Sequence, residues 1–424
     1  MKKRVVITGI GPFTTHGTNP DQLFRNLCNS ETKQKLIKPL EFLNYKFKTK
    51  YYIPLPDTDL SHYNIDPTHN IIMDDIPRMT LISAVNAILD AGFTLEHENK
   101  HYSIKGDFSN PAIIYGIGIS NLHSSFKSNA AHIGYEDKYG LYGNNKYDRF
   151  VVPKMMPNSA AAWVAIMLKL TGQSFTINAS CASGTVAIGE AYRKIADGYN
   201  DIAITGGVES LRDPTLSIMR GFDTLSALTK SENGNPTPFS HNRSGFLFSE
   251  GGAATLILEE YQHALKRDAR IYAEISGFES NNDNSNIVQP DKSGINIISL
   301  INKLKNSKKI DYLNAHGTGT ELNDAVESIV IKTAFGNKDK QPLINSTKSI
   351  MGHTIGASGA IEAAVTALSI YNNMVHPNLS ENNFDELNLI NKTTEFNINN
   401  AISTSYGFGG HNAGLLFSSV KEIR

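Results

Sequence analysis

Cys181 stands where an apolar run gives way to small residues. Residues 177–185 read INASCASGT, and a helix is expected directly afterwards, over 185–198. A thiol in the first turn of a helix meets unpaired backbone N–H groups and the positive end of the helix dipole, and both favour the thiolate. The position therefore suits a nucleophile, although a buried structural cysteine is the commoner fate of a free thiol.

Two motifs further along the chain each hold a histidine among glycine, serine and threonine. Residues 314–320 read NAHGTGT and place His316 at the end of a predicted strand, where a loop begins. Residues 345–360 read NSTKSIMGHTIGASGA and place His353 ahead of a small-residue helix expected over about 357–370. A lone histidine is more often a packed or solvated residue. Two histidines in loops of this kind indicate a catalytic role, because catalytic groups concentrate on loops held by a rigid scaffold.

A glycine-rich segment near the end of the sequence surrounds one phenylalanine. Residues 403–414 read STSYGFGGHNAG, with Phe408 between glycines. Glycine allows positive φ and a close approach of the backbone, so this loop could direct an N–H group at a reacting oxygen. The alternative is a simple glycine-rich turn between two strands.

The strands and helices that must position these motifs alternate in two series. The first has expected strands at 4–10, 112–119, 174–179, 202–206 and 253–259, with helices such as 79–91 and 185–198 between them. The second has expected strands at 271–278, 312–314, 343–345, 401–404 and 414–418. Polar stretches at 143–145 and 281–286 are interpreted as surface loops. Because 424 residues are too many for one ordinary core, the pattern predicts a doubled α/β fold.

Composition narrows the class of protein. The 40 basic residues balance the 41 acidic ones, which leaves no general field for nucleic acid or an anionic membrane. The two cysteines provide no disulfide framework, and Cys28 is interpreted as a packing residue. Glycine and proline within residues 9–12 argue against a signal peptide, and the apolar run 160–168 is too short to span a bilayer. We expect a cytoplasmic globular enzyme.

Taken together, the cysteine segment, both histidine motifs and the Gly-Phe-Gly-Gly loop resemble those of β-ketoacyl-acyl carrier protein synthases of the thiolase superfamily, and most of all the synthase II group. The resemblance begins at residues 4–11 (RVVITGIG), includes residues 236–239 (PTPF) and 248–252 (FSEGG), and covers essentially the whole chain. It implies a thiolase-like fold, in which two pseudo-repeated α/β halves form a layered αβαβα core. We place the half with the nucleophile at residues 1–260 and the half with both histidines at 261–424.

The resemblance also implies a reaction. Cys181 would take over an acyl group from a thioester, while the N–H groups of Cys181 and Phe408 stabilise the oxyanion. Malonyl on an acyl carrier protein would then lose carbon dioxide, with Nε2–H donors from His316 and His353 at the enolate oxygen. The carbanion would attack the acyl-enzyme. No permanently bound cofactor or metal is implied, because the reacting groups travel on the phosphopantetheine arm of the carrier.

Further positions match the family by motif. Lys348 and Glu327 match a charged pair that orders the site, and Thr318 and Thr320 match threonines that bind the phosphopantetheine arm. Phe408 also matches a gating phenylalanine beside the cysteine. Two features depart from the pattern: His411 stands where many members have threonine, and residues 285–290 (SNIVQP) lack a common His-Met-Thr-Ser sequence. These departures bear on the contacts with the substrate and with the carrier arm, and not on the type of reaction.

Some features resemble the ketosynthase subunit of type II polyketide synthases, which make aromatic or polyene products. They are residues 152–157 (VPKMMP), Trp163 and residues 322–324 (LND). A subunit of this kind implies a heterodimer with a cysteine-less chain-length homologue; otherwise we expect a homodimer. By resemblance, the strand at 174–179 would pair with its counterpart in the partner.

Other functions remain to be weighed. A housekeeping fatty-acid synthase II shares most of these motifs. A biosynthetic thiolase would need a second cysteine after Cys181, and a chalcone-synthase-like or synthase III enzyme would have asparagine in place of His353. A zinc site built from Cys181, His316 and His353 is disfavoured because no close pair of ligands exists in the sequence. A non-catalytic chain-length subunit is disfavoured by Cys181 itself.

Overall fold

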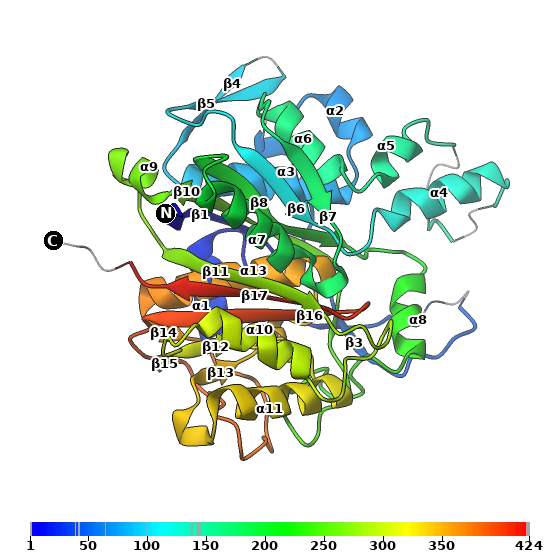
Figure 1. Cartoon of the computed structure of the whole chain (residues 1–424). Coiled ribbons are helices and arrows are strands. Elements are labelled where there is room, and N and C mark those ends of the chain that lie inside the picture. Colours follow the sequence, from blue (N-terminus) through cyan, green and yellow to red (C-terminus); the bar gives the residue numbers. More distant parts are fainter. Residues whose placement is uncertain are drawn as a thin grey trace.

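A computed structural model describes residues 2–38, 40, 43–63, 65–98, 100–136, 139–141 and 146–420 (Figure 1). The surface loop expected at 143–145 lies outside the described residues. The loop expected at 281–286 begins only after Asn282, because residues 281 and 282 still pair with the neighbouring strand at the end of β11 (Ala273–Asn282). Within the described part of the chain, no helix is long and apolar enough to cross a membrane.

Ten strands form one mixed sheet in the order β13-β12-β16-β17-β11-β1-β10-β8-β6-β7. Their bounds are β1 Val5–Phe13, β6 Ala112–Gly116, β7 Ser174–Ile177, β8 Ile202–Ser210, β10 Gly251–Glu260, β11 Ala273–Asn282, β12 Tyr312–Asn314, β13 Leu343–Asn345, β16 Asn400–Gly407 and β17 His411–Ser418. Each strand expected from the sequence is present, with ends that differ by a few residues.

The sheet consists of two halves with the same pattern of strand pairing. In the first half, β6 pairs in parallel with β7 and β8, and β10 pairs antiparallel with β8 and β1. In the second half, β12 pairs in parallel with β13 and β16, and β17 pairs antiparallel with β16 and β11. The halves join where β1 pairs with β11. The doubled α/β fold predicted from the sequence is confirmed.

Helices form three layers around the two halves of the sheet (Figure 1). On the outer face of the first half lie α3 (Asp75–Asp90) and α6 (Ser159–Met167), and on that of the second half lie α10 (Ile295–Lys305) and α11 (Glu321–Phe335). Between the halves lie α7 (Ser183–Ala196) and α13 (Ser358–Asn372), which contact strands of both. The arrangement is the expected αβαβα order of layers.

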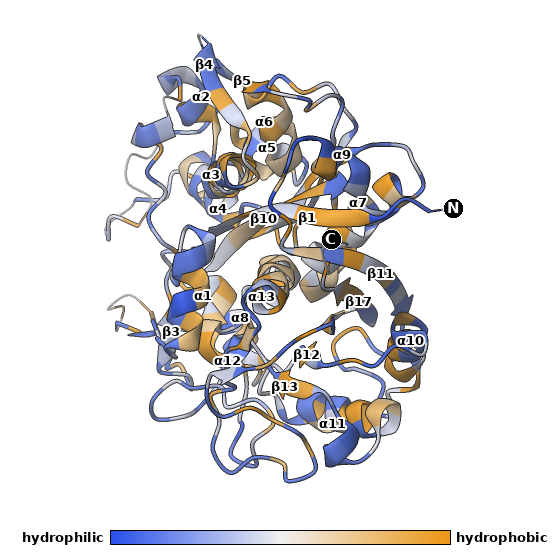
Figure 2. Cartoon of the chain, turned by 90° about the vertical axis from the view of Figure 1, so that its left-hand side faces the viewer, coloured by the Kyte–Doolittle hydropathy of each residue, from blue (hydrophilic) through white to orange (hydrophobic). Residues whose placement is uncertain are grey.

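Small residues allow the two middle helices to pack closely. Residues 358–370 of α13 are all buried, and Ala and Ser predominate among them. A Cβ atom placed on Gly184 of α7 would lie 2.7 Å from the backbone nitrogen of Ala360, so only glycine fits there. Figure 2 shows β1 as a hydrophobic strand near the middle of the molecule, as its fully buried sequence requires.

The remaining elements surround this framework. The helices are α1 Pro20–Cys28, α2 Pro67–Ile72, α4 Leu122–His132, α5 Val151–Met155, α8 Ser217–Thr224, α9 Tyr261–Lys266 and α12 Lys348–Met351, and the short strands are β2 Lys35–Leu36, β3 Tyr51–Ile53, β4 Thr94–Glu98, β5 His101–Lys105, β9 Phe248–Ser249, β14 Met374–Val375 and β15 Thr394–Glu395. Two 3-10 turns, Ser180–Ala182 and Ile355–Ala357, lead into α7 and α13. The first turn contains Cys181, and the second begins two residues after His353.

Candidate active site at the junction of the halves

Cys181 lies in the 3-10 turn that joins β7 to α7. The turn is sharp because Ser180 adopts a positive φ of 54°. The cysteine is 6% exposed, and burial raises the pKa of its thiol. The Ser180 hydroxyl, the Lys348 charge and the Phe408 N–H all act in the opposite direction. The expectation that the helix end lowers the pKa of the thiol is therefore corrected: burial prevails, and the pKa lies above its usual value.

The hairpin between β16 and β17 brings Phe408 to the cysteine. A Cβ atom on Gly407 would lie 2.7 Å from the carbonyl oxygen of Ala179 and 3.0 Å from the backbone nitrogen of Cys181. Only glycine permits this approach, which places the Phe408 N–H against the thiol. The glycine-rich segment is thus more than a turn, because it supplies a backbone donor beside the nucleophile.

His316 follows β12 and is held on both sides. Its backbone N–H donates to a carboxylate oxygen of Glu327 at 2.9 Å, and the next N–H, from Gly317, donates to the other oxygen at 2.8 Å. Nζ of Lys348 lies 3.2 Å from Nδ1 of the ring. An ammonium group can only donate, so Nδ1 accepts and the ring proton is assigned to Nε2. Burial and the Lys348 charge hold the pKa of His316 well below its usual value.

His353 precedes α13 and is fixed in the same tautomer. Its backbone N–H donates to Leu247 at 2.9 Å, while the N–H of Ile355 donates to its Nδ1 at 3.2 Å. The Ser358 hydroxyl also contacts Nδ1, at 2.9 Å. The proton therefore lies on Nε2, and burial, followed by the Lys348 charge, lowers the pKa so that the ring stays neutral. The two histidine rings are 5.6 Å apart, at 85° to one another.

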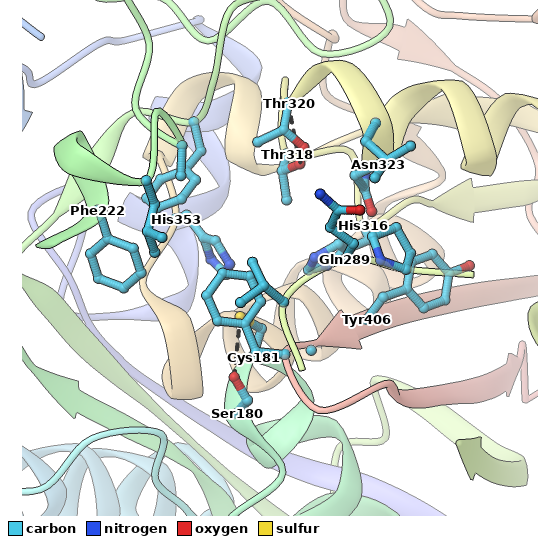
Figure 3. A pocket seen from close by; sticks show the side chains of 18 of the residues that line it. Ser180, Cys181, Phe222, Gln289, His316, Thr318, Thr320, Asn323, His353 and Tyr406 are labelled. Carbon is cyan, nitrogen blue, oxygen red and sulfur yellow. Dashed lines mark hydrogen bonds between the residues drawn. The ribbon is translucent and has the colours of Figure 1, made fainter. Parts of the chain in front are cut away.

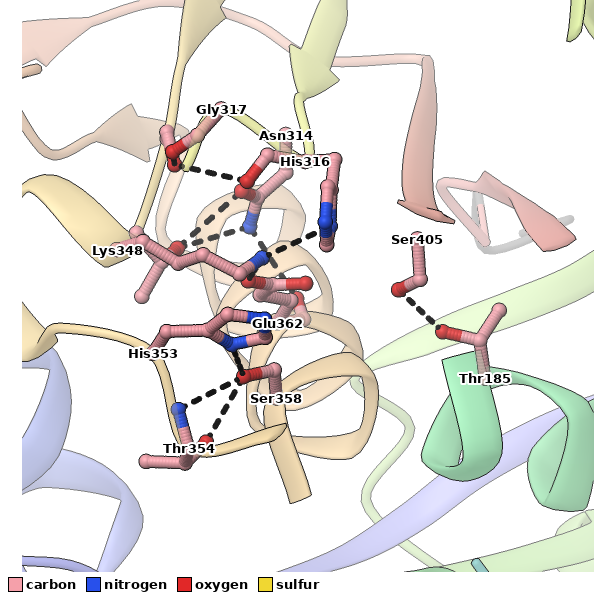
Figure 4. A network of polar contacts seen from close by, with 12 residues as sticks. Thr185, Asn314, His316, Gly317, Lys348, His353, Thr354, Ser358, Glu362 and Ser405 are labelled. Carbon is pink, nitrogen blue, oxygen red and sulfur yellow. Dashed lines mark hydrogen bonds and ion pairs between the residues drawn. The ribbon is translucent and has the colours of Figure 1, made fainter. Parts of the chain in front are cut away.

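Lys348 forms its ion pair with Glu362 of α13, and both side chains are 2% exposed (Figure 4). Glu327 contacts the His316 backbone instead, and it is not a partner of Lys348 among the ion pairs of the described residues. Lys348 and Glu327 thus both hold His316, one at the ring and one at the backbone, while the ion-pair partner of the lysine is Glu362. Burial raises the pKa of Glu362 and of Glu327 to about 7 in each case.

A cavity of about 640 Å³ opens above the cysteine (Figure 3). Cys181, His316, His353, Phe408, Thr318 and Thr320 all line it. The two threonine hydroxyls lie 2.9 Å apart. Lys348 and Glu327 lie behind His316, and the cavity lining does not include them. The structure thus brings together, from both halves, the side chains that the sequence marks as chemical.

The two departures from the family pattern lie in different places. Val288, Gln289 and Pro290 form part of the cavity wall, so the unusual segment at 285–290 faces the space where a substrate would lie. His411 is exposed at the start of β17 and does not line the cavity, whereas its neighbour Asn412 does. The substitution at His411 therefore acts, if at all, through the hairpin and not by contact.

Sequence reasoning missed several residues of the site. Glu362 carried a usable signal, because a lone carboxylate in a helix of small residues must find a cation once it is buried. Phe222 and Phe246 pack edge to face, and the centroid of the Phe246 ring lies 5.1 Å from that of His353. The centroid of the Tyr406 ring lies 5.3 Å from that of His316. Ordinary aromatic residues in strands and helices give no sequence signal of this kind.

Comparisons with known proteins agree with this geometry. The model of the beta-ketoacyl synthase N-terminal domain matches residues 2–264, and that of the C-terminal domain matches residues 272–382. The chain belongs to the beta-ketoacyl synthase family. It is 33% identical, over 98% of its length and 99% of the relative's, to 3-oxoacyl-[acyl-carrier-protein] synthase 1 of Buchnera aphidicola, and 31% identical, over 98% of both chains, to synthase 2 of Rhizobium meliloti.

Solved structures give the same result. A type II polyketide synthase acyl carrier protein in complex with its ketosynthase, bound to the hexaketide, is similar with a TM-score of 0.82, 26% identity and coverage of 99% of this chain and 100% of that one. The ishigamide ketosynthase/chain length factor shares the fold, with a TM-score of 0.85, 24% identity and the same coverage. The protein is a ketosynthase of the thiolase fold, an enzyme of the acyltransferase type.

Proposed function

We propose that the chain catalyses decarboxylative Claisen condensation of an acyl group on Cys181 with malonyl-acyl carrier protein. The observation that carries this proposal is the fixed tautomer of both histidines: each Nδ1 has a donor at 3.2 Å, so each Nε2 donates into one cavity. Two neutral donors beside a thiol suit an enolate oxygen, and they do not suit a general base. The roles that we propose for individual residues follow from this arrangement.

In the first step, the sulfur of Cys181 attacks the thioester carbonyl of the incoming acyl carrier. The N–H groups of Cys181 and Phe408 stabilise the oxyanion, and the tetrahedral intermediate collapses with loss of the phosphopantetheine thiolate. The thiol proton passes to the departing sulfur, so the net result is an acyl-enzyme and a free carrier thiol. Charge from Lys348 assists the loss of this proton.

In the second step, malonyl carrier enters and loses its carboxylate as carbon dioxide. The bond electrons become an enolate, and Nε2–H of His316 and of His353 donate to its oxygen. Removing one such donor typically raises the barrier by about 3 kcal/mol. The carbanion then attacks the acyl carbon and expels the Cys181 thiolate. The product is a β-ketoacyl thioester two carbons longer, and the thiolate recovers a proton from solvent.

The arm of the carrier supplies the reacting thioesters, and we assign Thr318 and Thr320 to it. Their paired hydroxyls lie on the cavity wall beside His316, where an amide of the arm could accept or donate. We assign the gate to Phe408, whose loop contains glycines on both sides. Residues 1–260 and 261–424 form the two halves in this proposal, with the division at Glu260, where β10 ends.

We further propose that the product is a type II polyketide and that the partner is a cysteine-less chain-length homologue. Support comes from residues 152–157, Trp163 and 322–324, and from the solved type II polyketide ketosynthase that is 26% identical to this chain. Asn323 lines the cavity, so this feature lies near the substrate. A homodimer working in the cytoplasm is the alternative assembly.

Fatty-acid elongation is the second candidate, favoured by the curated names of the relatives at 33% and 31% identity. Incubation with acyl carrier, malonyl carrier and no reductase separates the two. Repeated condensation to an unreduced chain supports an aromatic polyketide, whereas arrest after one condensation supports fatty-acid elongation or a polyene, since both need reduction between condensations. Absence of any condensation, with or without a partner subunit, contradicts the proposed reaction itself.

A further inference from the structure

Glu209, in β8, is a fully buried carboxylate that only backbone groups hold. Its Oε2 accepts hydrogen bonds from Gly118 N–H and Gly356 N–H, each at 3.0 Å, and Ile119 N–H lies 3.1 Å from both oxygens. None of the ion pairs of the described residues includes it. Burial without a cation raises the pKa of Glu209 to about 8, and the hydrogen bonds from the backbone N–H groups act against this shift.

The three donors belong to loops of different halves that meet beside the nucleophile. Gly118 and Ile119 follow β6 in the first half, and Gly356 lies in the 3-10 turn that leads into α13. A Cβ atom on Gly356 would lie 2.2 Å from the Gly118 nitrogen and 2.8 Å from Oε2 of Glu209, so glycine is required for the contact. The carboxylate thus joins the two loops at their closest approach.

Ile355 lies between His353 and Gly356, the glycine bound to Glu209, and adopts an unfavourable backbone conformation. Its φ is +48°, a region that β-branched residues avoid. In this conformation its N–H points at Nδ1 of His353, 3.2 Å away, and helps to keep the proton on Nε2. Conformations of this kind persist only where surrounding contacts enforce them. The hydrogen bond from Gly356 to Glu209 is such a contact, one residue further along the chain.

We propose that Glu209 is a positioning residue for the decarboxylation step, acting through Gly356 and Ile355 on His353. The inference rests on the proposed function, which assigns decarboxylation to His353 and acylation to Cys181. Glu209 accepts no hydrogen bond from the N–H groups of Cys181 and Phe408, and its charge acts on the nucleophile only by raising the pKa of the thiol, so its removal does not weaken that group. Loss of the hydrogen bonds between Glu209 and the two loops therefore impairs decarboxylation of malonyl carrier more than acyl transfer to the cysteine.

The test compares these two half reactions in three variants of Glu209 and in one control variant. Glu209→Leu keeps the volume but removes every acceptor, so decarboxylation falls by about tenfold or more while acyl transfer stays within about threefold of the parent, as mispositioning of a catalytic group implies. Glu209→Gln keeps one oxygen for Gly118 and Gly356 and preserves the ratio. Should the leucine variant not fold, Glu209→Asp withdraws the carboxylate by one methylene and shifts the ratio in the same direction.

The matched control is Glu259→Leu. Glu259 is also a fully buried carboxylate of the first half, but it bonds Thr8, His263 and Arg267 and lies outside the cavity lining. Its replacement lowers the melting temperature without changing the ratio of the two half reactions. If Glu209→Leu lowers both half reactions in equal proportion, or lowers neither, the inference is overturned.

A second measurement tests the route through Ile355. Glycine adopts positive φ without strain, so Ile355→Gly introduced together with Glu209→Leu restores part of the lost decarboxylation, by about threefold or more. No recovery in the double variant argues against this route. A parent enzyme that acylates Cys181 but never decarboxylates malonyl carrier contradicts the proposed function instead, and the two failures are therefore distinguishable.

Discussion

Nζ of Lys348 lies 3.2 Å from Nδ1 of His316, although 32 positions separate the two residues in the chain. The same ammonium contacts Glu362, so one buried cation connects His316 to α13, the helix between the halves. This contact fixes the tautomer of His316 and opposes its protonation. It also assists thiolate formation at Cys181 by charge alone. A single lysine thus serves both stages of the proposed reaction.

Replacement of Cys181 by alanine is expected to abolish acyl transfer, because the thiol is the proposed acyl acceptor. Mass spectrometry after incubation with acyl carrier should show one acyl group on the parent chain and none on the Cys181→Ala variant. Cys28→Ala is the matched control and should acylate normally, since burial raises the pKa of Cys28 to about 11. An acyl group on Cys28, with turnover retained in Cys181→Ala, would show that the nucleophile is misassigned.

The ion pair under His316 makes a prediction about stability as well as activity. Lys348→Met leaves Glu362 buried without its cation, and removal of one partner of a buried pair costs about 3–5 kcal/mol in the free energy of unfolding. The double variant Lys348→Met with Glu362→Leu removes both charges and should recover most of that loss in urea denaturation. Decarboxylation should stay low in both variants, since neither has a donor at Nδ1 of His316. Recovery of activity along with stability would contradict a role for Lys348 in the chemistry.

His316 and His353, the proposed enolate-binding histidines, both have lowered pKa values, so they weaken the fold in acid. Below the unfolded value of 6.5 the unfolded chain binds protons that the folded rings do not accept, and stability therefore falls as pH falls from about 7 to 5. His353→Asn removes one of these groups and should flatten the slope of unfolding free energy against pH by up to about 1.4 kcal/mol per pH unit. His241→Asn, at a histidine outside the cavity lining, is the comparison. Equal slopes in the parent and His353→Asn would mean that this ring is not neutral and buried in solution.

The glycines around Phe408 predict a mobile gate. Gly407 and Gly409 can absorb backbone rotation, so the phenylalanine could move aside as an acyl chain enters. Phe408→Ala should relax the preference among acyl chains and lower the rate of condensation. Competition between carriers of different chain length measures the first effect directly. Unchanged selectivity and rate across the series would remove the gate from the mechanism.

The sequence reveals those parts of the site whose chemistry is local. Cys181, His316 and His353 each stand in a motif of small and polar residues, and strand and helix periodicity places them at the ends of elements. The role of Glu362 cannot be predicted in this way because its partner Lys348 lies on another element, and the sequence does not show that Glu327 contacts the His316 backbone while Lys348 contacts its ring. Glu209 is harder still to find, since its partners are backbone N–H groups, which any sequence supplies. Contacts of this kind depend on how the halves pack.

The end strand β7 predicts that the chain works as a dimer. Nothing in the described part of the chain pairs with its outer edge, and an unpaired edge is an aggregation hazard. Ile166, on the helix α6 that packs against β7, is 47% exposed, and Val152, on the neighbouring α5, is 64% exposed. We expect Ile166→Glu to shift the mass in solution from two chains towards one, with loss of elongation. Ile295→Glu, at an exposed apolar residue on α10 of the other half, is the matched control and should leave the mass unchanged.

Expression with and without a cysteine-less homologue then identifies the partner. An active dimer of the chain alone contradicts the heterodimer. A stable monomer with full elongation activity contradicts the dimer itself.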